Sequence, residues 1–278
     1  MNNDDLNALK AAINLLENPS LGAKIADFIG SPIEKAIARL PNGAKNTIAI
    51  AAQKAVQAAL TLSLKTLVHQ NVPNEKRPES SDWWHIAGTV TTGAIGGAFG
   101  ILVLPIELPI STTIILRSIA DVARSEGADL SNIETQLECV RVLALGGQSS
   151  NDDDAEIGYF VVRDAMATMV ANAAAHIAKK GLKTEGAPAL VQLIIKVAEL
   201  YSITITEKAA GQLVPVIGAV AGAGINAMFT SHFQNMAHGH FTVLRLESEY
   251  GQEVVRSKYA IFKNQNTHRA NDSYMTRP

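Results

Sequence analysis

The sequence predicts an all-α protein, a multi-helix bundle around two glycine-rich hydrophobic central helices. Apolar residues make up 47% of the 278 residues and charged residues only 18%, an apolar composition for a soluble domain. Most of the chain repeats apolar side chains every three or four residues, as an amphipathic helix does. Two long stretches, residues 86–106 and 209–231, contain no charged residue. We therefore expect amphipathic helices around an unusually apolar centre.

The N-terminal region, residues 1–75, is predicted to be helical. Apolar residues recur at helical spacing through residues 3–40, with interruptions at the proline-containing positions 18–20 and 30–32. Residues 45–69 are rich in alanine and leucine and contain neither glycine nor proline, so they predict one long helix.

The central region, residues 76–263, follows a charged, proline-bearing linker at 74–82. After the first neutral segment, helical patterns predict helices over 111–124 and 132–145, and the glycine and polar residues between them indicate a helix stop and a cap. Aspartates at the end of a polar loop, 146–154, suit the N-terminus of a following helix.

The next elements are helices over 155–180 and from residue 187 onward. The alternating run 202–206 (SITIT) predicts a short strand, the one plausible strand that we identify. After the second neutral segment we expect a final helix over 232–262, and a polar, disordered tail over 264–278.

Glycines in both neutral segments stand four residues apart, which places them on one face of a helix and allows a second helix to approach closely. The pairs are Gly93/Gly97, Gly96/Gly100 and Gly218/Gly222. Each segment is long enough to cross a bilayer, but glycine, threonine and proline lower its tendency to insert. Three interpretations stay open: two buried helices of a soluble domain, reversible membrane association, and a cavity for a lipid-like ligand.

Charge and cysteine content exclude several classes of function. A net charge of −2 and an isoelectric point near 6.4, with dispersed basic residues, argue against a nucleic-acid partner. Cys139, the single cysteine, permits no intramolecular disulfide and is predicted to be a core residue. The acidic N-terminus lacks a signal peptide, which predicts a cytoplasmic protein, with peripheral attachment to the inner face of the cytoplasmic membrane left open. No cofactor is predicted.

Residues 222–227 match the permissive dinucleotide-binding pattern GxGxxA. That pattern requires a preceding strand within a βαβ unit, whereas the flanking residues are helical in character. Helix packing is the better explanation of these glycines.

A polar strip is predicted on the helix that follows. His232, His240 and Glu247 fall on one face at about 100° per residue. Two imidazoles and a carboxylate could bind a metal or transfer protons. His232 and His240 stand about 12 Å apart along the axis, too far to bind one ion together. The alternative is a strip that forms hydrogen bonds with neighbouring helices.

Glu107 lies between two prolines among apolar residues, where an unpaired carboxylate would be costly. We expect it to pair with an arginine such as Arg117 or Arg124, or to act as a functional acid. Arg117, Asp121 and Arg124 have the spacing of local ion pairs on a helix.

Several stretches taken together resemble the EcsC protein family, over about residues 45–260. They are LPIELPISTT (104–113), LRSIADVAR (116–124), ECVRVLALGG (138–147), TEKAAGQLVPVIG (206–218), NAMF (226–229) and HFTVLRLE (240–247).

The resemblance implies a bacterial protein, cytoplasmic or membrane-associated, whose family supplies no agreed catalytic residues. The positions that match its motifs, and are therefore candidates for ligand binding, are Glu107, Arg117, Lys208, Gln212, Asn226, His240, Arg245 and Glu247.

Our leading hypothesis is a non-enzymatic helical protein that associates with membrane lipid or an apolar small molecule through the neutral segments. It could serve as an accessory to a membrane transporter or another membrane protein complex. The alternative is a metal-assisted hydrolase that uses His240 and Glu247, with Glu107 or His232 completing the site.

Overall fold

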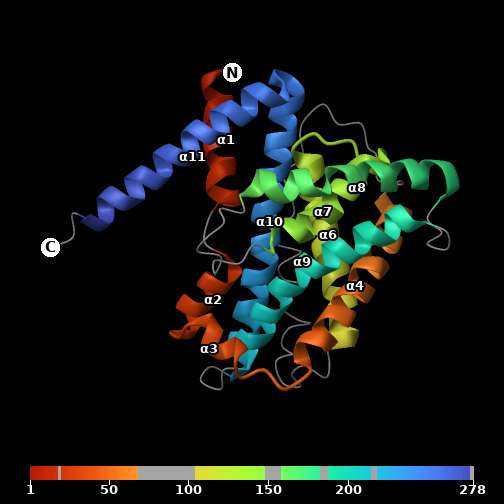
Figure 1. The fold of residues 1–278 in the computed structure, drawn as a ribbon, viewed down its shortest axis with the longest axis vertical. Coiled ribbons are helices and arrows are strands. Elements are labelled where there is room, and N and C mark those ends of the chain that lie inside the picture. The colour runs from red at the N-terminus through yellow and green to blue at the C-terminus, as the bar shows by residue number, and fades with distance from the viewer. Residues whose placement is uncertain (18–19, 68–103, 148–157, 182–186, 214–217, 276–278) are drawn as a thin grey trace.

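The structure, a computed structural model, confirms an all-α architecture (Figure 1). Its described residues form ten helices and no strand. They comprise residues 1–17, 20–67, 104–147, 158–181, 187–213 and 218–275. The linker predicted at 74–82 and residues 86–103 of the first neutral segment lie outside this set.

Three short helices begin the chain: α1 (Asn3–Leu16), α2 (Leu21–Ile29) and α3 (Ile33–Ile37). Polar side chains cap the first two, because Asn2 accepts a hydrogen bond from the Asp5 amide and Ser20 accepts one from Ala23. The breaks between these helices fall where the sequence predicted them.

The long helix α4 (Ala44–Leu67) packs against α6 (Leu104–Ser125) and α9 (Pro188–Gln212). Its buried face consists largely of alanine, so the neighbouring helices can approach closely. The buried residues among those described are Ala44, Ile48, Ala51, Ala52, Ala55, Val56, Ala59 and Leu60. The N-terminal helices therefore share one hydrophobic core with later helices.

The helix α10 (Gly218–Tyr250) is the longest described element and contacts α1, α2, α6, α7, α9 and α11. Figure 1 shows it running through the length of the bundle, with α7 (Ile133–Leu145) and α8 (Tyr159–Lys180) to one side. Because α10 meets helices from every part of the chain, its polar residues have neighbours distant in sequence.

Three predictions about individual elements were wrong. Residues 202–206 are not a strand but part of α9, where Thr204 and Ile205 are buried in the core. The predicted final helix is divided at Gly251, whose φ of 86° is a conformation that favours glycine, and α11 (Gln252–Met275) follows. No glycine or proline interrupts α11, which continues through residues 264–275 where we expected a disordered tail.

The second neutral segment contributes the end of α9 and the beginning of α10. The GxGxxA pattern lies within α10, as helix packing requires, and a Cβ atom at Gly224 would lie 3.1 Å from the Phe28 ring. Within the described part of the chain, α9 alone is long and apolar enough to cross a membrane. The most apolar stretch of α9 is 44% buried inside the protein. Core helices of soluble proteins can have the same length and apolar composition.

Candidate functional site

A buried ion pair joins α6 to α9. Nζ of Lys208 donates a hydrogen bond to Oε1 of Glu107 at 3.2 Å, and the two side chains are 0% and 7% exposed. The ammonium group also lies 4.7 Å from the centre of the Phe229 ring on α10. Burial lowers the pKa of Lys208, and Glu107 opposes that shift.

The expectation of an arginine partner for Glu107 was wrong. Arg117 is exposed, and Arg124 forms its ion pair with Asp121 one turn away on the same helix. The acid is instead paired with a lysine 101 residues further along the chain.

This pair is formed by the two charged residues that border the neutral segments in the sequence. Glu107 is the first charged residue after residues 86–106, and Lys208 is the last before residues 209–231. Residue 106, which ends the first segment, precedes Glu107, and residue 209, which begins the second, follows Lys208; these two charged residues are in contact. Both charges are withdrawn from water.

Polar groups with incomplete hydrogen bonding lie on α9 near this pair. Gln212 follows Gly211 near the end of α9. A Cβ atom added to Gly211 would lie 3.2 Å from Ile225 on α10, so the two helices are in close contact there. The buried Asn226 is the next residue of α10. Nε2 of Gln212 and Oγ1 of Thr204 are buried and find no hydrogen-bond partner among the described residues. A ligand with polar groups could therefore bond here.

A second acid of α9, Glu207, is 5% exposed and accepts a hydrogen bond from the backbone of Gly22 on α2. Burial, together with the nearby charge of Glu34, raises its pKa to about 7. The folded state therefore holds this proton more tightly than the unfolded chain, so ionisation destabilises the fold as the pH rises from about 4.5 to 7.

Glu207→Gln is therefore expected to raise the free energy of unfolding at pH 8 by roughly 1–3 kcal/mol and to change it little at pH 4. Urea denaturation at the two pH values measures the difference. Glu199→Gln, an exposed position of the same helix, should have little effect at either pH. Equal gains at both pH values would contradict this prediction.

The polar strip of α10 is buried, and its members contact different helices. His240 is fully buried between Tyr159 of α8, whose hydroxyl lies 2.8 Å from Nδ1, and Glu138 of α7, whose carboxylate lies 2.9 Å from Nε2. A carboxylate can only accept, so Nε2 carries the proton and the tyrosine hydroxyl donates to Nδ1. Burial lowers the pKa of His240 to about 4, so the imidazole is neutral at pH 7.

Two arginines complete this network. Arg141 forms an ion pair with Glu138, and Arg163 of α8 binds both carboxylate oxygens of Glu247, with Nη1 2.8 Å from Oε1. Burial raises the pKa of Glu138, but His240 and Arg141 outweigh that effect and hold it below its usual value. The network is thus a set of paired charges inside the bundle.

The hydrolase alternative is not supported by this arrangement. His232 contacts the Gly146 carbonyl through Nε2 at 2.9 Å, while both nitrogens of His240 contact Tyr159 and Glu138, and Arg163 binds both oxygens of Glu247. No group of three or more His, Cys, Asp or Glu side chains that could hold a metal occurs in the described part of the chain.

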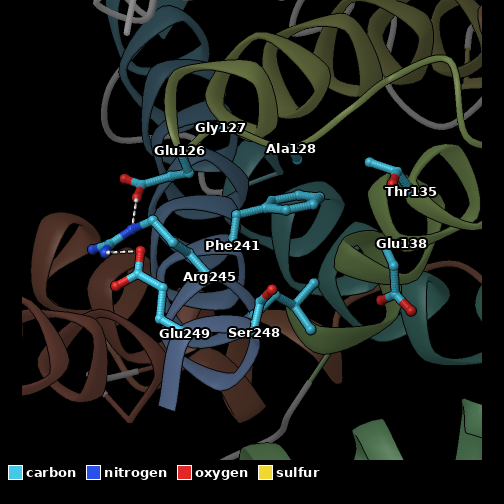
Figure 2. Close-up of a pocket in the computed structure, with 10 residues that line it drawn as sticks. Glu126, Gly127, Ala128, Thr135, Glu138, Phe241, Arg245, Ser248 and Glu249 are labelled. Carbon is cyan, nitrogen blue, oxygen red and sulfur yellow. Dashed lines mark hydrogen bonds and ion pairs between the residues drawn. The ribbon is translucent and has the colours of Figure 1, made fainter. Parts of the chain in front are cut away.

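Arg245, the remaining motif residue, lies in the wall of a pocket of about 410 Å³ near the end of α10 (Figure 2). Its guanidinium forms ion pairs with Glu126 at 3.6 Å and Glu249 at 3.3 Å. Glu138 also lines the pocket, which therefore extends to the acid that binds His240.

Four important members of the network were missed by sequence reasoning: Glu138, Arg141, Tyr159 and Arg163. One signal was available, because each arginine lies in a largely apolar run: Arg141 in CVRVLAL (139–145), and Arg163 in FVVRDAM (160–166), where Asp164 is the other charged residue. A charge within an apolar helical run indicates a buried partner.

Comparison with known proteins identifies the family of this chain. The model of the EcsC protein family matches residues 6–246, beginning well before the region that carried the resemblance. No curated protein and no solved structure matches the chain. The match spans the helices that hold Glu107, Lys208 and His240. The chain belongs to the EcsC protein family.

Proposed function

We propose that this protein is a non-enzymatic helical protein that associates reversibly with lipid through its two neutral segments. The observation that carries the proposal is the buried pair of Glu107 and Lys208. It brings the end of one neutral segment beside the beginning of the other, so a lipid could contact both.

Energetics favour reversible association over permanent insertion. Residues 86–106 contain nine strongly apolar residues, each of which favours insertion by roughly 0.3–0.6 kcal/mol at the helix centre. Five glycines, three threonines and a proline oppose this sum, and Glu107 would oppose it further if it lay deep in the bilayer. A balance near zero suits a protein that binds and leaves a membrane surface.

Liposome flotation of the full chain tests the proposal, together with lipid extraction from the purified protein. We expect flotation with neutral phosphatidylcholine vesicles that persists at high salt, because the neutral segments carry no charge to be screened. Phe99→Glu, in the middle of the first segment, should reduce flotation strongly because a charge near lipid is costly.

Val161→Glu is the matched control, since it introduces the same charge at a 56% exposed apolar residue of α8, outside both segments. It should leave flotation intact. A wild-type protein that neither floats nor carries extractable lipid would refute the proposal, as would equal flotation of the wild type and the Phe99→Glu variant.

A further inference from the structure

The pocket near the end of α10 is separate from the region proposed to meet lipid. It opens between the end of α6, α7 and the last turns of α10, and its volume of about 410 Å³ is in the range of pockets that bind small molecules. Arg245 lies 16 residues beyond Phe229 on α10, roughly 24 Å along the helix axis. The two regions can therefore be tested independently.

One wall of the pocket carries excess negative charge. Arg245 forms ion pairs with Glu126, Glu249 and Asp5, the last at 3.2 Å. His238 lies 3.7 Å from Glu126 and adds at most one positive charge. The pocket lining itself holds three carboxylates, those of Glu126, Glu138 and Glu249, and one positive residue, Arg245. The balance is negative even if His238 is charged, so an anionic ligand would be repelled and a cation attracted.

The remainder of the pocket has an apolar surface and one further acid, Glu138. Phe241 and Leu244 line it, and Figure 2 places the Phe241 ring between the Arg245 cluster and the side that holds Thr135 and Glu138. Glu138 is fixed by His240 and Arg141, so its position is set before any ligand arrives. The lining is suited to an apolar chain that ends in a positive group.

We propose that this pocket binds a small organic ammonium ion, with its charged group beside Glu126 and Glu249 and its apolar chain against Phe241 and Leu244. An ammonium group donates up to three hydrogen bonds, which carboxylates and the hydroxyl of Ser248 can accept.

Isothermal titration calorimetry of the full chain tests this site with two probes of equal chain length and opposite charge, pentylamine and pentanoate. Pentylamine is expected to bind and pentanoate is not. Glu249→Gln, at a side chain that is 41% exposed, should weaken pentylamine binding about ten-fold, the effect of losing one charge-assisted hydrogen bond. Ser248→Trp fills an exposed position of the lining and should abolish binding.

Glu253→Gln makes the same change in net charge at an exposed residue outside the pocket and should leave binding unchanged. The proposal is overturned if pentylamine fails to bind at millimolar concentration or if pentanoate binds as well. It is equally overturned if the Glu249→Gln and Ser248→Trp variants bind pentylamine like the wild type.

Discussion

Arg163→Met is expected to lower the free energy of unfolding by about 3–5 kcal/mol, because it leaves the Glu247 carboxylate buried without its partner. In the folded protein the two side chains are only 10% and 9% exposed, and the guanidinium binds both carboxylate oxygens. Water cannot replace these hydrogen bonds without opening the contact between α8 and α10. Urea denaturation followed by circular dichroism measures the loss.

The chain offers a matched control for this variant. Arg256 makes a similar two-point contact with Asp164, also on α8, but that pair is 30% and 49% exposed. Arg256→Met should therefore cost less than about 1 kcal/mol. The double variant Arg163→Met/Glu247→Leu should recover much of the loss, because no unpaired charge remains. Similar losses for both single variants would show that burial does not determine the effect.

Lys208→Met is expected to have the second large effect, also about 3–5 kcal/mol, because Glu107 would remain buried and unpaired. The lysine is completely buried, and it also loses its contact with the Phe229 ring. Methionine has a similar length, so the change removes the charge with little change in volume. Thermal and urea unfolding of the variant measure the loss.

Lys196→Met is the comparison on the same helix, since Lys196 pairs with Glu199 at 3.1 Å on the exposed surface. We expect a loss below about 1 kcal/mol there. A double-mutant cycle with Glu107→Leu should give a coupling energy of at least about 1 kcal/mol between Glu107 and Lys208. Additive effects would mean that the two charges do not stabilise each other.

Local sequence patterns predicted the helices well because apolar periodicity is a property of neighbouring residues. They failed at residues 202–206, where alternating Ser, Ile and Thr satisfy the pattern of a strand over only five positions. In the protein, Tyr201 and Ile205, four residues apart, are both fully buried on one face of α9. The packing of a 25-residue helix outweighs the preference of residues 202–206 for a strand.

Sequence motifs singled out some of the residues in these buried pairs but not their partners. Motifs singled out Glu107, Lys208, His240 and Glu247, and all four are buried charged or polar groups of the core. Their partners come from other helices, between 81 and 102 residues away in sequence. Helical spacing identifies only neighbours one turn apart, so it suggested an arginine for Glu107 and could not indicate which helices face each other.

The position of α1 has a consequence for how the chain folds during synthesis. α1 packs on α10 and α11, where Asp5 bonds Arg245 and Glu17 bonds Tyr259, contacts that span 240 and 242 residues (Figure 1). At a ribosomal rate of roughly 5–20 residues per second, these partners emerge about 10–50 s after α1 does. Until then the apolar face formed by Leu9, Ile13 and Leu16 has no native surface to cover it. During synthesis α1 is therefore one of the helices that wait longest for their native contacts.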